Sequence, residues 1–276
     1  MVHLFFVVLT WCQFTFAADA ANTSLASSEQ VIQAAKPKFQ YTAVLDYKSN
    51  LYERDSDKFA DTSTLTLVPK WNLKNEDSVS LLTEISKDFQ DEERFELSTT
   101  NLIYGRKAIP FTFIDLASSA RLILPVSEEL KDRQGLKVGL AMDVTPKLKA
   151  EAVGLIGLTL SARTRVTKNF HDFETATSGN SNIEYALSER VDLGYDLTEK
   201  WNVSTILIYG LSRTYKNNQK ESFTWAQEIS YAVNAMTTIG VGHSNEGGLL
   251  KPNGDSNVSL FDEDSSTVYA YLQLVN

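Results

Sequence analysis

The chain contains 276 residues, 43% of them hydrophobic, and its formal net charge is −9. The hydrophobic content excludes a chain that is disordered throughout. The negative charge argues against nucleic acid as a partner, because phosphate binding needs clustered Lys and Arg. The single cysteine, Cys12, excludes an intramolecular disulfide and a zinc site built from several thiolates.

The N-terminus has the pattern of an export signal. Residues 4–17 form a mostly apolar stretch, and the small residues Ala17, Ala18 and Ala20 follow it or end it. This stretch is too short to span a bilayer comfortably, and its end fits a signal-peptidase site. We therefore predict a signal peptide over residues 1–18. Residues 19–38 are small and polar, and we predict that they form a flexible lead-in.

From Phe39 to the end of the chain, apolar and polar residues alternate. In residues 39–48, for example, Phe39, Leu45 and Tyr47 share one face and Asp46 lies on the other. A period of two predicts β-strands. Most of the strands would have ten or more residues, whereas soluble strands usually have about five or six. Twelve such strands are predicted: 39–48, 60–71, 78–89, 95–105, 111–124, 135–145, 148–165, 183–195, 200–213, 221–233, 236–244 and 266–275.

The connections between the predicted strands alternate in length. Those after every second strand are short, and the others are mostly longer and more polar, the longest being 166–182 and 245–265. This alternation is typical of outer-membrane barrels, which have short turns at one end and longer loops at the other. The short connections are 72–77, 106–110, 146–147, 196–199 and 234–235.

From residue 39 to residue 276 the chain resembles a Gram-negative outer-membrane β-barrel of porin-like architecture. Strand-end aromatics such as Trp71, Tyr195 and Trp201 fit the girdle that such barrels place at the membrane surface. The resemblance implies a closed, all-β, antiparallel, up-and-down barrel of about 12 strands in the cell outer membrane, with residues 19–38 in the periplasm. It also implies contact with outer-membrane lipid and with the barrel-assembly machinery. Such barrels often end in an aromatic residue, whereas this chain ends in Asn276.

A soluble antiparallel β-protein is the alternative, since its strands also alternate. In a soluble sandwich the apolar faces would point inward, whereas in the barrel they point to lipid and the polar faces line the interior. Twelve strands of this length are difficult to fit into a soluble sandwich. Two positions depart from the pattern: Glu189 lies on the apolar face of its strand, and the strand over 95–105 loses phase after Thr100, which predicts a bulge.

Charged residues on the polar faces are the candidate lining of the lumen, and acids and bases are nearly balanced there. They could be ion pairs that stabilise the wall, because unpaired charges in a narrow interior are costly. They could also form a charged constriction that selects solutes. The candidates are Asp46, Lys48, Glu84, Asp115, Arg121, Lys137, Asp143, Glu151, Arg163, Arg165, Arg190 and Glu228.

The two histidines outside the predicted signal peptide do not complete a known catalytic pattern. His243 and Ser244 are adjacent in a strand, so their side chains point to opposite faces and cannot form a His–Ser dyad. His171 and Asp172 lack the further pair of acids that an aspartyl protease needs. Phosphate loops and hydrolase motifs are missing from the sequence. We predict that the protein is not an enzyme and has neither a cofactor nor a metal site.

The sequence therefore predicts passive passage of small hydrophilic solutes across the outer membrane. Eight strands leave room only for side chains and sixteen leave an aqueous channel, so a twelve-stranded barrel has a narrow lumen whose side chains control access. A non-conducting structural or adhesive barrel is the main alternative. An outer-membrane enzyme and a soluble secreted β-protein are weaker ones.

Overall fold

The computed structural model describes residues 38–89, 95–250, 254–262 and 265–276. The predicted signal peptide, and the predicted lead-in apart from Lys38, lie outside the described residues. Among the described residues, no helix is long and apolar enough to cross a membrane.

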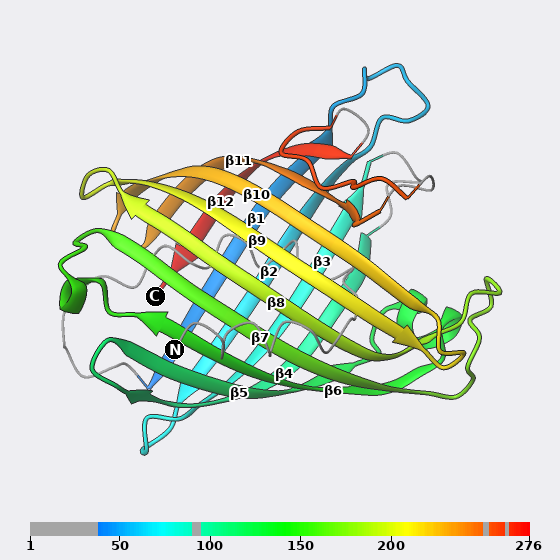
Figure 1. Cartoon of the computed structure of the whole chain (residues 1–276), viewed down its shortest axis with the longest axis horizontal. Helices are drawn as coiled ribbons and strands as arrows, with labels where there is room; N and C mark the ends of the chain where they lie inside the picture. The colour runs from blue at the N-terminus through cyan, green and yellow to red at the C-terminus, as the bar shows by residue number, and fades with distance from the viewer. Residues whose placement is uncertain (1–37, 90–94, 251–253, 263–264) are drawn as a thin grey trace.

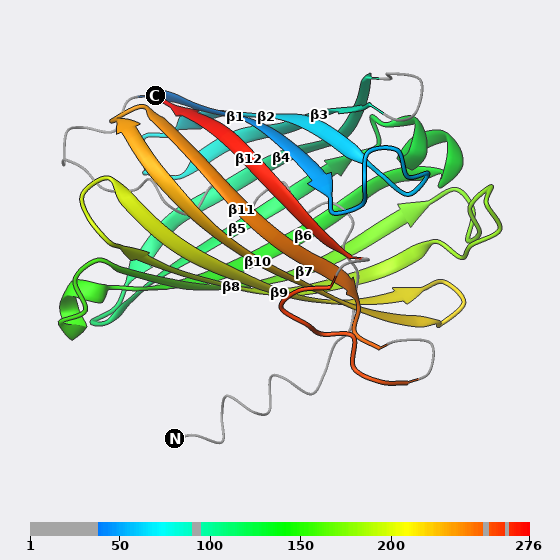
Figure 2. The ribbon, with the colours of Figure 1, turned by 90° about the horizontal axis from the view of Figure 1, so that it is seen from above.

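Twelve antiparallel strands form one closed barrel, which confirms the predicted fold (Figures 1 and 2). Each strand pairs with its neighbours in the chain, and β1 pairs with β12 to close the sheet. The strands are β1 (Phe39–Asn50), β2 (Asp61–Asn72), β3 (Ser78–Asp88), β4 (Phe95–Pro110), β5 (Ile114–Leu124), β6 (Leu136–Leu148), β7 (Leu158–His171), β8 (Ile183–Asp196), β9 (Trp201–Thr214), β10 (Gln219–Asn234), β11 (Thr237–Gly248) and β12 (Ser266–Val275).

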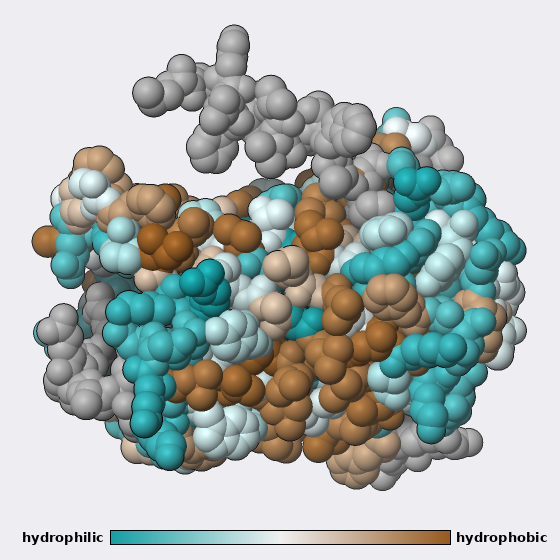
Figure 3. Space-filling view, turned by 90° about the horizontal axis from the view of Figure 1, so that it is seen from below, coloured by the Kyte–Doolittle hydropathy of each residue, from teal (hydrophilic) through white to brown (hydrophobic). Residues whose placement is uncertain are grey.

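Successive side chains point alternately into the barrel and away from it. In β1, Val44 is 2% exposed and Leu45 is 49% exposed; in β9, Ile206 is 1% exposed and Leu207 is 44% exposed. The outward residues are largely aliphatic, and on the face shown in Figure 3 they form an apolar band across the middle of the outer wall with hydrophilic residues on both sides. We call this surface the outer wall and the opposite face the lumen.

The two ends of the barrel differ. The turn end carries the connections 73–77, 111–113, 149–157, 197–200 and 235–236, together with the start of β1 and the end of β12 (Figure 1). The loop end carries the mostly longer connections, among them 125–135 with the π-helix η2 (Glu129–Arg133), 172–182 and 249–265. The alternation of shorter and longer connections follows the prediction.

The loop between β11 and β12 is attached to the outside of the barrel. The Phe261 ring stacks on the His243 ring, which projects from the outer wall, at 5.6 Å between centroids. Asn245 Nδ2 donates to the main-chain oxygen of Ser259 at 2.8 Å, and Ser265 Oγ donates to Asn245 Oδ1 at 2.6 Å. These contacts direct the described part of this loop over the outer wall.

Two boundary predictions around β4–β7 are wrong. β4 extends to Pro110, and β5 begins only at Ile114, so the predicted turn over 106–110 is strand. β6 extends to Leu148, so the predicted turn at Pro146–Lys147 is also strand. Both prolines lie near the turn end of their strand, where the loss of one N–H donor disrupts the ladder least.

The largest error concerns residues 148–157, predicted as the start of a strand. β7 begins at Leu158, and the preceding residues form a turn with the 3₁₀ helix η3 (Ala150–Val153). Gly154 and Gly157 adopt φ values of 75° and 85°, in the left-handed region, which break an extended chain. β4 does contain a bulge, but at Ser98, before Thr100 and not after it, because Glu84 pairs with Thr99 and Ile85 pairs with Leu97.

Candidate functional site: the lumen

One arc of the lumen, on β5–β8, carries a ladder of arginines. Arg121 Nε donates to Asp143 Oδ2 at 2.7 Å, and Arg165 Nε donates to Asp143 Oδ1 at 2.5 Å. Ser119 Oγ donates to the same carboxylate at 2.9 Å. Strand register explains this cluster, because Asp143 on β6 lies directly opposite Ser119 of β5 and Arg165 of β7. Asp143 is only 3% exposed, so the two guanidinium groups replace water around it.

The ladder continues on β7 and β8. Arg163 lies opposite Arg190 in the register of these strands, and Arg190 Nε donates to Asp192 Oδ1 at 2.7 Å. Ser161 Oγ donates to the other oxygen of Asp192 at 3.3 Å. We call Arg121, Asp143, Arg163, Arg165, Arg190 and Asp192 the arginine arc. Four guanidinium groups against two carboxylates give the arc an excess of two positive charges.

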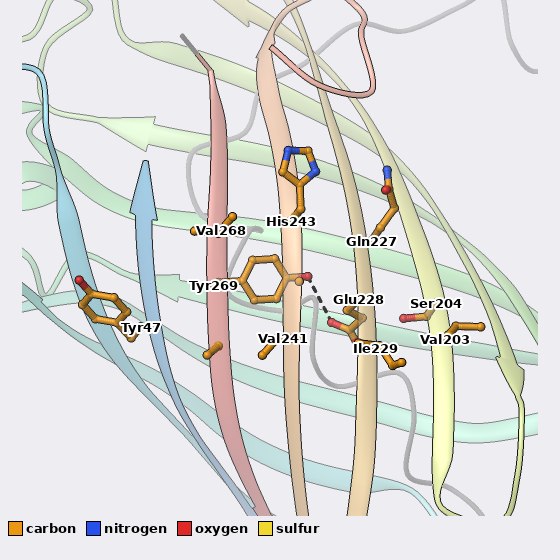
Figure 4. A pocket seen from close by; sticks show the side chains of 12 residues that line it. Tyr47, Val203, Ser204, Gln227, Glu228, Ile229, Val241, His243, Val268 and Tyr269 are labelled. Carbon is orange, nitrogen blue, oxygen red and sulfur yellow. Dashed lines mark hydrogen bonds between the residues drawn. The ribbon is translucent and has the colours of Figure 1, made fainter. Parts of the chain in front are cut away.

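A carboxylate held by tyrosines lies on β10–β12. Glu228, 7% exposed, accepts a hydrogen bond from the hydroxyl group of Tyr271 at 3.2 Å. It accepts a second from the hydroxyl group of Tyr269 at 3.3 Å (Figure 4). Both rings lie over β11, where the register places Gly240 opposite Tyr271 and Gly242 opposite Tyr269. A Cβ atom at either glycine would come within 2.4 Å of a tyrosine ring, so only glycine leaves room for this arrangement.

Two further acidic candidates, Asp46 and Glu84, lie on β1 and β3. Asp46 on β1 is opposite Tyr271, and Lys48 Nζ is 3.2 Å from Glu246 Oε1 of β11. Glu84 on β3 is 4% exposed and lies opposite Thr66 and Thr99. We call Glu228, Tyr269, Tyr271, Asp46 and Glu84 the acidic arc.

A small apolar cluster separates the two arcs on one side of the barrel. Ile206, Ile208 and Ala226 project into the lumen from β9 and β10 and are between 1% and 4% exposed. Ile206 is opposite Asp192, and Ile208 is opposite Arg190. The lumen is therefore closely packed at this wall rather than wide and open.

Three of the predicted lumen residues, Asp115, Lys137 and Glu151, lie at the ends of the barrel. Lys149 Nζ is 3.0 Å from Asp115 Oδ1 at the turn end. Lys137 Nζ is 2.6 Å from Asp172 Oδ1 at the loop end, with both side chains more than half exposed. Glu151 lies on η3, outside any strand, and is exposed, because the strand predicted to carry it is a turn. The other nine candidates lie on the lumen face of their strands, and their role in lining a pore stays a prediction.

The sequence interpretation did not assign the tyrosines that bind Glu228, or the glycines beneath their rings, to the lumen. Tyr269 and Tyr271 are aromatic, and aromatics in membrane barrels are expected on the outer wall. The available signal was the spacing itself, since Gly240 and Gly242 are two apart in one strand and Tyr269 and Tyr271 are two apart in the next.

The two histidines lie as the sequence predicted. His243 projects from the outer wall and Ser244 into the lumen, where the Ser244 and Thr267 hydroxyl oxygens are 2.8 Å apart. His171 Nδ1 is 3.4 Å from the Tyr215 hydroxyl, and Asp172 pairs with Lys137. Neither histidine faces a serine in these contacts.

Comparison with solved structures identifies the type of fold. An outer membrane channel from Pseudomonas putida F1 superposes with a TM-score of 0.60 at 8% identity, covering 89% of this chain and 100% of that one. The NanC porin superposes with a TM-score of 0.54 at 11% identity, covering 86% and 99%. No protein-family model and no curated sequence matches the chain. At these identities the likeness establishes the fold, which is that of Gram-negative outer-membrane β-barrels of porin-like architecture.

Proposed function

We propose that the protein is an outer-membrane channel for the passive passage of small hydrophilic solutes. The observation that carries the proposal is the inverted distribution of side chains: the outer wall is apolar, and the lumen holds Arg121, Arg165, Arg190, Glu228 and Asp46. A soluble barrel would present its apolar face inward, whereas a barrel in lipid presents it outward. The solved channels with this fold support the same conclusion.

The lengths of the connections suggest how the barrel is oriented in the membrane. Short turns face the periplasm in barrels of this kind and longer loops face the outside, so the turn end would be periplasmic. Export by residues 1–18 and insertion by the barrel-assembly machinery complete the proposal.

The packing of the lumen limits the size of the solutes. Ile206, Ile208 and Val44 are almost fully buried on the lumen face, which implies a passage lined by closely spaced side chains. The charged arcs would then contact any solute directly, and their charges would set ion selectivity. The same packing supports a second function, a non-conducting structural barrel, if the side chains leave no continuous path.

Two measurements test the proposal. Heated and unheated samples from outer membranes should migrate differently on SDS gels, which would establish a folded membrane barrel. The purified protein should then give discrete conductance steps in planar bilayers, and Ile208→Ala should enlarge them while Leu207→Ala, a matched change on the outer wall, should leave them unchanged. Absence of conductance in both the wild type and Ile208→Ala would favour the structural barrel. The absence of enzymatic activity stays a prediction.

A further inference from the structure

An apolar patch projects beyond the strands at the turn end of the barrel. It consists of residues on the end of β4, the turn before β5 and the turn before β7, and each is between 42% and 80% exposed. Exposed apolar groups gathered in one place usually mark an interaction surface. We call this surface the turn-end patch; its members are Ile109, Phe111, Phe113, Val153, Leu155 and Ile156.

Hydrogen bonds join the two turns that carry the turn-end patch. The main-chain N–H of Lys149 donates to the oxygen of Phe113 at 2.9 Å, and Lys149 Nζ donates to the oxygen of Phe111 at 2.9 Å. Within the second turn, the N–H of Leu155 donates to the oxygen of Ala150 at 2.9 Å. The apolar side chains are therefore held in place by an ordered backbone.

Two glycines reverse the chain around Leu155 and Ile156, which form the tip of the turn-end patch. Gly154 and Gly157 flank Leu155 and Ile156, and both have φ in the left-handed region. A Cβ atom at Gly154 would meet nothing within 4 Å, so this glycine is required by its backbone conformation and not by lack of space. The reversal leaves Leu155 51% exposed and Ile156 80% exposed.

The turn-end patch is continuous with the outer wall. Ile109 lies opposite Leu116 of β5 on the outward face, and Leu116 lies opposite Pro146 of β6. The nearby cations do not belong to this surface, because Lys147 lies on the lumen face opposite Asp115 and Ser161, and Lys149 Nζ is 3.0 Å from Asp115 Oδ1. Exposed apolar side chains that continue the outer wall fit the boundary between lipid headgroups and acyl chains.

We propose that the turn-end patch inserts into the lipid leaflet at the turn end and fastens the β4–β7 side of the barrel to it. The inference rests on the proposed membrane location of the barrel and adds to it that two connections, which would otherwise extend into water, lie in the lipid interface. The turn between β8 and β9 differs, since apart from the exposed Leu197 it holds the polar residues Thr198, Glu199 and Lys200 and is closed by hydrogen bonds to Thr198 Oγ1.

Site-specific fluorescence tests the proposal. Because Cys12 lies in the predicted signal peptide, the exported chain has no other cysteine, and Ile156→Cys can be labelled with an environment-sensitive fluorophore. The labelled barrel is inserted into vesicles of phosphatidylethanolamine and phosphatidylglycerol. We expect a blue-shifted emission that lipids with a quencher near the headgroup diminish. Matched labels are Glu199→Cys on the polar turn, which should stay unquenched, and Leu207→Cys on the outer wall, which deeper quenchers should diminish.

The three labels separate the possible failures. If Ile156→Cys behaves like Glu199→Cys while the Leu207→Cys label is quenched, the barrel is in the membrane and the inference is wrong. If the Leu207→Cys label is not quenched either, the membrane location fails and the inference falls with it. Shielding of the Ile156→Cys label only after addition of periplasmic proteins would identify a protein as the occupant and would also overturn the lipid proposal.

Discussion

The two arcs of the lumen stabilise buried carboxylates in different ways. In the arginine arc, Asp143 is held between Arg121 and Arg165, so its charge is neutralised by neighbouring strands. In the acidic arc, Glu228 accepts hydrogen bonds from the hydroxyl groups of Tyr269 and Tyr271, which are neutral and do not balance a carboxylate charge. Removing a member of the first arc should therefore affect stability most, and removing a member of the second should affect ion selectivity most.

The largest effect is expected from Asp143→Ala. The substitution leaves two buried guanidinium groups without the carboxylate between them, and breaking such a buried pair typically costs about 3–5 kcal/mol. Denaturant unfolding of the refolded barrel in detergent should show the loss. Asp143→Asn, which keeps an acceptor oxygen, is the control and should lose less. Equal, small effects of both substitutions would show that the arginine arc does not stabilise the wall.

A smaller loss is expected from Gly240→Ala. The added Cβ atom would lie 2.4 Å from the Tyr271 ring and would force the ring away from Glu228. Overpacking of this kind typically costs about 1–3 kcal/mol. Gly194→Ala is a matched control in β8, because its Cβ atom would meet its nearest neighbour at 3.6 Å. If the two variants unfold at the same denaturant concentration, the packing of tyrosine on glycine is not needed for stability.

Glu228→Gln should change selectivity more than stability. The amide oxygen can accept from one tyrosine hydroxyl and the NH2 group can donate to the oxygen of the other, but one negative charge is lost from the lumen. We expect the reversal potential in a salt gradient to move toward anion preference, whereas Glu199→Gln on the exposed turn should move it much less. A reversal potential that is unchanged in Glu228→Gln would mean that permeating ions do not pass the acidic arc.

The smallest effect concerns a second carboxylate held by a tyrosine, outside the membrane-spanning strands. Asp77, in the turn before β3, accepts hydrogen bonds from the Tyr104 hydroxyl, from the Lys107 N–H at 2.8 Å and from Asn75. These bonds, that of Tyr104 foremost, lower the pKa of Asp77 below its ordinary value. The stability they contribute is complete above the pKa of the unfolded chain, near pH 4, and is lost as pH falls through the lower folded pKa.

Asp77→Asn therefore tests the turn by pH dependence. The variant should be slightly less stable than the wild type at neutral pH, and the difference should shrink as the pH is lowered below about 4. Unfolding midpoints measured at several pH values check this expectation. A difference that stays constant with pH would show that the charge of Asp77 does not matter to the turn.

Strand parity explains why so much of the lumen was predictable. The period of two decides which face a residue occupies, so Asp46, Arg165 and Glu228 could be assigned to the lumen from the sequence alone. Parity does not determine how neighbouring strands are aligned. That alignment, the register, is what brings Asp143 into contact with both Arg121 and Arg165. The sequence was therefore enough to assign residues to the lumen, but the structure was needed to show which of them are in contact.

The failure at residues 148–157 has a different cause. Leu148, Ala150, Ala152 and Ile156 alternate as in a strand, but the conformation there is set by Gly154 and Gly157. Glycine can extend a strand or reverse it, and only the φ values distinguish the two outcomes. Glu151 was assigned to the lumen by this false alternation.

Closure of the barrel by β1 and β12 has a consequence for the order of folding. The first and last strands pair over residues Thr42–Asn50 and Thr267–Val275, so the contact that closes the sheet joins opposite ends of the barrel sequence. Contacts so distant in sequence form slowly, and until β12 arrives the sheet has two open edges that can pair with other chains. The nascent protein thus needs protection from aggregation until its final residues are in place.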